Sequence, residues 1–226
     1  MPHDKIMNIN LGLNQKSENS ATLLAYNSLR EKILTGELAP DRKLKIEELR
    51  KLLGVGASPI REALSLLTSD QLVVRQDQRG FRTALTSREN FQEILELRCE
   101  VEGIALRQSI EKLTDAWVEE LVLAHHRMAR SKNTVPEQFE TLHKGFHMAL
   151  INNCNSKLLV GFCSQLYDLN IRYRYIAARA SGYSARNIGD EHKHILEAVI
   201  SSSFEDANAL LSSHYKTTGA FIETFI

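Results

Sequence analysis

The chain has 226 residues, 43% of them hydrophobic and 25% charged, and its 28 basic and 28 acidic side chains balance. This composition is typical of a soluble globular protein with room for one large domain or two modest ones. No apolar run approaches the roughly 20 residues that cross a bilayer, the N-terminus lacks the apolar core of a signal peptide, and three dispersed cysteines argue against disulfides. We therefore expect a cytoplasmic protein without a membrane partner.

Three segments differ in composition. Residues 1–20 are rich in Asn, Ser and Lys, which predicts a flexible tail. Residues 21–86 hold 11 lysines and arginines against 8 acidic residues, and residues 87–226 carry the compensating negative charge. This asymmetry is mild, but it has the sign expected if the front half binds DNA.

Two helices are predicted at the start of the second segment. The apolar spacing favours a helix from about Ala21 to Thr35, and Gly36 ends it. The stretch "LAPDRKLK" then predicts a turn and a short extended piece. A second helix is expected over Ile46 to Leu53, where Gly54 stops it.

A tight turn, "GVGAS", leads into a third helix that runs to about Asp70. Ser58 is a natural N-cap for this helix, and Pro59 occupies the first helical position, where a missing N–H costs nothing. The following stretch, "LVVRQDQRGFRTALT", predicts two short strands joined by a turn at "DQRG".

Two helices separated by a glycine-containing turn, followed by a hairpin, form the layout of a winged helix-turn-helix. An arginine one turn into the second of these helices can bind a guanine edge or a phosphate, and a basic hairpin with a glycine can approach a minor groove. The candidate DNA-binding residues are Arg50, Ser58, Arg61, Glu62, Arg79, Gly80 and Arg82. The alternative is a helical hairpin with a solvated basic surface.

From Ser87 onward strand signals vanish. We expect six helices joined by short connections, over 87–111, 114–132, 135–153, 155–180, 186–202 and 204–225. Thr114, Asn155 and Ser203 are plausible N-caps. Short connections make neighbouring helices pack antiparallel, so the predicted fold is mainly α, a winged helix-turn-helix followed by an all-α antiparallel helical bundle.

Four histidines occupy apolar stripes of these helices. His143 and His147 are four residues apart and share one helix face, and His192 and His214 lie at core-facing spacing on two other helices. Four buried imidazoles can share one cation. The alternative is that each is a core histidine with its own hydrogen-bond partners.

Arg98 lies mid-helix among apolar residues, where a charge is costly unless it is paired. It can form an ion pair with a glutamate such as Glu102, or serve as a fork for a ligand carboxylate. Arg172 and Arg174 are weaker candidates for ligand binding.

The stretch from "YNSLREKILTGEL" through "LGVGASPIREALSLL" to "LVVRQDQRGFRTA" resembles the winged helix-turn-helix of the GntR family of regulators. The helical segment after it resembles the all-helical ligand-binding domain of the family's FCD subgroup, and together the resemblances cover about residues 21–222. The turn departs from the family pattern, because Ala57 stands where relatives have an arginine that contacts DNA. The arginine of the family's "PxRE" motif and the glycine of its wing are both present, as Arg61 and Gly80.

The resemblance also implies a metal site. Metal-binding members of the subgroup have a "DxxxH" pair, a histidine in "EHxxIxxA" and one near the C-terminus, which match "HKGFH", "EHKHILEA" and His214 here. His143 stands where relatives usually have Asp or Asn. We expect a divalent ion, with Zn²⁺ or Ni²⁺ favoured, held by His143, His147, His192 and His214.

These features predict a ligand-responsive transcription regulator and not an enzyme. We expect a homodimer on a pseudo-palindromic double-stranded operator, with a small carboxylate effector bound at the metal and at Arg98. The rival hypothesis is a metal-dependent enzyme built on the helical bundle, in which the metal activates water and Glu140 is the residue to mutate first. A third is a scaffold without metal.

Overall fold

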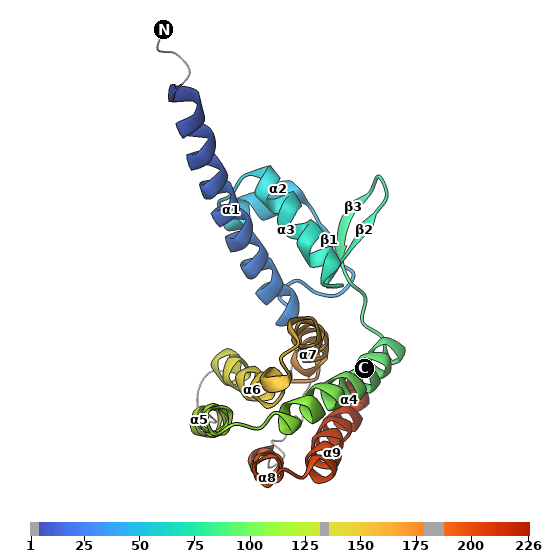
Figure 1. The fold of residues 1–226 in the computed structure, drawn as a ribbon. Helices are drawn as coiled ribbons and strands as arrows, with labels where there is room; N and C mark the ends of the chain where they lie inside the picture. Colours follow the sequence, from blue (N-terminus) through green and yellow to red (C-terminus); the bar gives the residue numbers. More distant parts are fainter. Residues whose placement is uncertain (1–4, 132–135, 179–187) are drawn as a thin grey trace. The chain divides into compact units, whose positions relative to one another are not determined.

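The computed structural model describes residues 5–131, 136–178 and 188–226. The chain forms two compact units, Met1–Thr86 and Ser87–Ile226. In chain order, the first contains α1 (Lys5–Leu34), β1 (Lys43–Leu44), α2 (Ile46–Leu53), α3 (Ala57–Ser69), β2 (Val73–Gln76) and β3 (Gly80–Thr83) (Figure 1).

The first helix begins at Lys5 and not near Ala21, so the segment predicted to be a flexible tail is helical from Lys5 onward. No proline interrupts this stretch, and the backbone donors needed to continue a helix are therefore present. The helix ends at Leu34, close to the predicted end, and Gly36 follows with a positive φ of 74°. Its buried Leu29 and Ile33 belong to the half that packs against α3.

Helices α2 and α3 form the predicted helix-turn-helix. Gly54 caps α2 in the left-handed conformation at φ 66°, where its N–H donates to the carbonyl of Arg50. The start of α3 differs from the prediction, since Gly56 is the N-cap and the Ser58 hydroxyl makes no cap hydrogen bond. That hydroxyl instead donates to the carboxylate of Glu62, one turn further on, at 3.2 Å.

A three-stranded antiparallel sheet with strand order β1-β3-β2 completes the unit. The hairpin of β2 and β3 has the predicted "DQRG" turn, in which Gln78 and Gly80 adopt positive φ values of 58° and 90°. The short extended piece predicted before α2 is strand β1, which pairs Lys43 with Arg82 and Leu44 with Phe81 of β3.

The second unit holds the six predicted helices. They are α4 (Arg88–Glu111), α5 (Asp115–Arg130), α6 (Pro136–Ile151), α7 (Lys157–Ala178), α8 (Ile188–Ile200) and α9 (Phe204–Ile222), with the short 3-10 helices η1 (Asn152–Cys154) and η2 (Glu223–Phe225). The predicted helix limits at residues 132, 135, 180 and 186 fall outside the described residues.

Two of the three predicted caps are present. Thr114 accepts from the backbone N–H of Trp117, and Ser203 accepts from that of Asp206. Asn155 is not a cap of α7, because it ends η1 in the left-handed conformation at φ 59°. The next residue, Ser156, takes this role with a 3.3 Å hydrogen bond from the N–H of Leu159. Asparagine tolerates the left-handed region, which explains the shift by one position.

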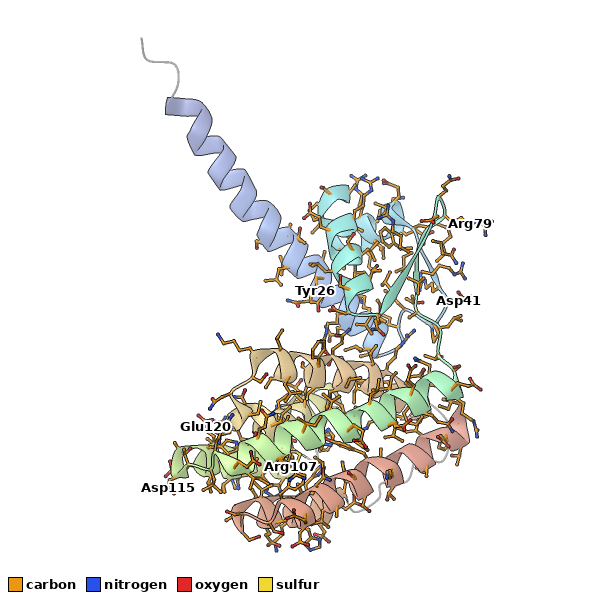
Figure 2. The ribbon with its side chains drawn as sticks, turned by 45° about the vertical axis from the view of Figure 1, so that its right-hand side comes forward. Tyr26, Asp41, Arg79, Arg107, Asp115 and Glu120 are labelled. Carbon is orange, nitrogen blue, oxygen red and sulfur yellow. The ribbon has the colours of Figure 1, made fainter. Side chains whose placement is uncertain are left out.

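The bundle is organised around α4, which packs against α7 and α9, while α5 packs against α6 and α8. The pairing of α4 with α9 joins the first and last long helices of the unit, which run side by side in both views (Figures 1 and 2). Phe146, Leu106, Leu121 and Ile195 lie fully buried at its centre. No helix in the described ranges combines the length and apolarity that a bilayer crossing requires.

Candidate metal centre and DNA-binding surface

The structure brings the four sequence-predicted histidines together in the core of the bundle. His143 and His147 project from adjacent turns of α6, His192 from α8 and His214 from α9, and all four are buried. One nitrogen of each lies within 4.8 Å of the others. The helix faces that hold these histidines are otherwise apolar and pack into the core, so the imidazoles lie there as well.

The nitrogens that face the middle of this cluster are the Nε2 atoms of at least three rings. Nε2 of His147 lies 3.3 Å from Nε2 of His143 and 3.3 Å from Nε2 of His192. Burial lowers the pKa of His143 and His147 well below the usual range, and that of His192 to about 2. These imidazoles are therefore neutral at pH 7, which is the form that binds metal.

The chemistry of this donor set fits a divalent transition metal. Four imidazoles within reach of one point suit Zn²⁺, Ni²⁺ or Cu²⁺, because an imidazole that binds a metal supplies a nitrogen lone pair and brings no charge of its own. A hard, oxygen-seeking ion such as Mg²⁺ does not match nitrogen donors.

Oxygen atoms contact the outward nitrogens of three of the rings. Nδ1 of His143 lies 2.6 Å from the Tyr167 hydroxyl, and Nδ1 of His147 lies 2.8 Å from the Tyr215 hydroxyl. Nδ1 of His214 lies 2.7 Å from a carboxylate oxygen of Glu191. Partners of this kind orient metal-binding histidines and set which nitrogen carries the proton.

A cavity adjoins the cluster. Its lining residues are Leu95, Arg98, His143, Asn170, Arg174, His214, Tyr215, Thr218, Gly219 and Ile222. Two guanidinium groups and two cluster histidines therefore line one space, together with the polar side chains of Asn170, Tyr215 and Thr218.

Arg98 has the first of the two roles that the sequence left open for it, an ion pair with Glu102. Its Nε donates to Glu102 at 2.7 Å and its Nη1 to the side-chain oxygen of Asn170 at 3.0 Å. Burial alone would lower the pKa of Arg98, but the carboxylate of Glu102 and other neighbours outweigh this and raise it. Its Nη2 is buried and has no hydrogen-bond partner among the described residues. A ligand oxygen could satisfy that donor.

The two weaker arginine candidates differ in position. Arg174 lines the cavity, forms a 2.9 Å ion pair with Glu140, and places Nη1 3.2 Å from Nδ1 of His143. Arg172 is buried as well, but it is not among the lining residues. The cavity therefore favours Arg174 over Arg172 as a second anion-binding group.

Sequence reasoning missed both tyrosines, Asn170 and Glu191. A signal existed on α7, where Tyr167, Asn170 and Arg174 are three and four residues apart and so share one face. All three side chains are polar and buried, and buried polar groups require partners. The role of Tyr215 had no comparable signal, because its partner Glu102 is 113 residues away.

The candidate DNA-binding residues lie on the surface of the first unit. Arg61 is exposed on α3, and Arg50 of α2 is exposed and pairs with Glu47 at 2.9 Å. Glu62 is engaged by two hydroxyls, since Thr22 of α1 donates to one carboxylate oxygen at 2.8 Å and Ser58 to the other. These contacts connect the start of α3 to α1.

The hairpin carries the remaining candidates. Arg79 is exposed in its turn, next to Gly80, as Figure 2 shows near the end of the hairpin. Arg82 lies further down β3 and pairs with Asp41 at 2.7 Å, with a second hydrogen bond from its Nη2 to the Asp41 carbonyl oxygen. Arg82 therefore ties the hairpin to the turn before β1, and Arg79 is the freer of the two arginines to reach a ligand.

A helix-turn-helix flanked by a basic β-hairpin is a winged-helix DNA-binding domain, and here it is joined to a six-helix bundle with a buried histidine cluster. Family models agree with both units. The model for bacterial regulatory proteins of the gntR family matches residues 22–82, and the model for the FCD domain matches residues 93–217. The chain belongs to the gntR family of bacterial regulatory proteins, in the group with an FCD domain, and is a DNA-binding transcriptional regulator.

Relatives with curated names are similar along most of their length. BphR of Paraburkholderia xenovorans LB400, an HTH-type transcriptional regulator, is 31% identical over 207 residues, which are 88% of this chain and 84% of the relative. GlaR of Escherichia coli K12, an HTH-type transcriptional repressor, is 28% identical over 204 residues, which are 87% of this chain and 93% of the relative. Among solved structures, E. coli McbR/YncC shares the fold with a TM-score of 0.77 at 22% identity, covering 90% of this chain and 97% of that one.

Proposed function

We propose that this regulator binds operator DNA as a homodimer and that a small organic carboxylate, held at a divalent metal in the helical unit, changes its affinity for that operator. The observation that carries the proposal is the buried cluster of four histidines beside a cavity lined by Arg98 and Arg174. A cation centre next to guanidinium donors is complementary to an anion.

His143, His147, His192 and His214 would hold the metal. When bound, a divalent ion supplies positive charge to which a carboxylate can add. Because histidine binds a metal as a neutral imidazole, the four ligands would cancel none of that charge. Zn²⁺ and Ni²⁺ are the favoured ions. A Zn²⁺ ion closed by four histidines would be structural, whereas an ion with a higher coordination number would leave positions for the effector.

Arg98 would orient the effector. Its Nη2 is a buried donor without a partner among the described residues, while its other nitrogens are fixed by Glu102 and Asn170. A guanidinium that is already held in place loses little conformational freedom when a carboxylate binds to it. Arg174 would act as the second cationic group of the same cavity.

On the DNA side, Arg61 would contact a base edge or phosphate in the major groove, with Arg50, Ser58 and Glu62 around it. Arg79 and Gly80 would approach the minor groove, and Arg82 would support the hairpin through Asp41. Two copies related by a two-fold axis predict a pseudo-palindromic operator. Effector binding would bias the helix packing of the bundle, and so the arrangement of the two DNA-binding units in the dimer.

Metal analysis with a thermal-shift screen tests this proposal. Protein purified without a histidine tag or chelator should contain about one equivalent of metal per chain, and small carboxylates should raise its Tm in proportion to the logarithm of their excess. The His147→Ala variant should lose both effects. His194→Ala is the matched control, because His194 is exposed on α8 and lies outside the cluster.

Two results would contradict the proposal. Wild-type protein without metal, and with no shift for any carboxylate, would favour a metal-free scaffold. Turnover of a carboxylate by the metal-loaded protein, lost in Glu140→Gln, would favour the rival metallo-enzyme, since Glu140 lies 3.7 Å from His143.

A further inference from the structure

The Tyr215 hydroxyl bridges a cluster histidine and a buried carboxylate. It lies 2.8 Å from Nδ1 of His147 and 2.5 Å from Oε2 of Glu102, and all three side chains are buried. The bridge joins residues of three helices, α4, α6 and α9. The second oxygen of the same carboxylate, Oε1, accepts from Nε of Arg98 at 2.7 Å.

The direction of each hydrogen bond in this chain follows from the chemistry of its members. The carboxylate of Glu102 is ion-paired with Arg98, so it can only accept, and the Tyr215 hydroxyl must donate its single hydrogen to it. Toward His147 the same hydroxyl oxygen is therefore the acceptor. Nδ1 of His147 must carry the proton, and a neutral imidazole protonated at Nδ1 has its lone pair on Nε2.

The tautomer matters more at His147 than elsewhere in the cluster. Its Nε2 lies 3.3 Å from Nε2 of both His143 and His192, so this nitrogen occupies the middle of the set. A proton on that atom would point into the space between the rings and block it for any cation. His214 contacts a carboxylate, that of Glu191, directly, whereas among the described residues His147 is connected to a carboxylate through Tyr215.

We propose that Tyr215, held as a donor by Glu102, is a positioning residue that fixes His147 in the Nδ1–H tautomer and so keeps Nε2 open toward the other three histidines. This inference deepens the proposed function. Its consequence for metal binding rests on that function. Its structural content, the location of one proton, is independent of any metal. Because Glu102 also holds Arg98, the same carboxylate supports both the cluster and the candidate effector anchor.

Imidazole NMR tests the inference on metal-free, full-length protein. Long-range ¹H–¹⁵N spectra at pH 7, with His147 assigned from the spectrum of His147→Gln, report which ring nitrogen carries the proton. In the wild type we expect His147 as the Nδ1–H tautomer. In Tyr215→Phe, which removes only the hydroxyl, we expect a mixture of tautomers or the Nε2–H form.

Zn²⁺ affinity, measured by competition with a chromophoric chelator, gives the second readout. Tyr215→Phe should bind Zn²⁺ about 10- to 100-fold more weakly than the wild type, the usual effect of removing a group that orients a ligand. Tyr173→Phe is the matched control. It removes a buried hydroxyl that bonds to Asn90, away from the cluster, and should change neither the tautomer nor the affinity.

The two proposals fail in different ways. His147 protonated at Nε2 in the wild type would overturn the inference, as would Tyr215→Phe that folds and binds Zn²⁺ like the wild type. If Tyr215→Phe does not fold, the wild-type spectrum alone decides the location of the proton. Wild-type protein that shows the Nδ1–H tautomer but binds no Zn²⁺ would overturn the metal centre and uphold the hydrogen-bond assignment.

Discussion

Nε of Arg98 donates to Oε1 of Glu102 across 2.7 Å, one turn apart on α4, and the two side chains are only 5% and 1% exposed. Neighbouring side chains also hold this pair in place, because Asn170 accepts a hydrogen bond from Arg98 and Tyr215 donates one to Glu102. Removing one member leaves a charge in the core with no counter-charge.

The pair therefore predicts a large stability effect. Arg98→Met keeps the length of the side chain but leaves the Glu102 carboxylate uncompensated, which should lower the free energy of unfolding by about 3–5 kcal/mol. Urea denaturation measures the change. Lys193→Ala breaks the exposed pair of Lys193 with Glu197 at the same i, i+4 spacing and should cost under about 1 kcal/mol. Equal losses for the two variants would refute the argument from burial.

Gly219 offers a way to fill the cavity without touching a charged group. A methyl group at this position would clash with Cδ2 of Leu95, and both residues line the cavity. Gly219→Ala should displace Leu95, cost about 1–3 kcal/mol of stability and weaken effector-induced thermal shifts.

Gly161→Ala is the control for helix propensity. Gly161 lies on α7 with no atom within 4 Å of an added Cβ, so alanine should stabilise the protein by about 0.5–1 kcal/mol. A destabilised Gly161→Ala, or a Gly219→Ala variant more stable than the wild type, would show that close packing does not govern these sites.

Arg61 should contribute to sequence-specific DNA binding. With a duplex selected by the wild-type protein from a random library, Arg61→Ala should lose about 1–3 kcal/mol of binding free energy and relax the preference at one base pair. Fluorescence anisotropy at fixed salt measures both effects. An unchanged affinity and preference would mean that this exposed arginine of α3 does not reach the DNA bases.

Arg79, in the hairpin turn, should behave differently. If it meets a phosphate or the minor groove, Arg79→Ala weakens binding to all duplexes alike, and the slope of log K against log salt falls by about one. Titrations at several salt concentrations give the slope. Loss of preference at a single base pair, with the slope unchanged, would assign Arg79 a base-reading role instead.

Metal removal should destabilise the helical unit. An ion that binds only the folded state at 100 times its Kd adds about 2.7 kcal/mol to the free energy of unfolding, so chelator-treated protein should melt at a lower temperature and recover when Zn²⁺ or Ni²⁺ is added back. His192→Ala should abolish this recovery. If the variant recovers as the wild type does, His192 is not a ligand.

Local patterns in the sequence were enough to place most of the helices. Gly54 ends α2, and Thr114 and Ser203 cap α5 and α9, because a cap depends on a few adjacent backbone groups. The i, i+4 spacing of His143 and His147, with apolar neighbours, was likewise sufficient to predict that both face the core.

The errors came from contacts between distant residues or from competition within a turn. Ser58 has the sequence context of an N-cap, yet its hydroxyl bonds to Glu62, which also accepts from Thr22, 40 residues earlier in the chain. Asn155 was displaced as a cap because it adopts the left-handed conformation. The spacing of apolar residues along the sequence shows neither the contacts between distant residues nor which residue of a turn becomes the cap.

The amino-acid sequence by itself determined the helix-turn-helix, the bundle and which histidines lie on buried faces, since these depend on residues a few positions apart. Only the tertiary structure decided that Tyr215 lies between Glu102 and His147, and that Arg98, which lines the cavity, keeps one buried donor without a partner among the described residues. Such positions result from packing helices that are distant in sequence, where each buried polar atom must find its partner in another element.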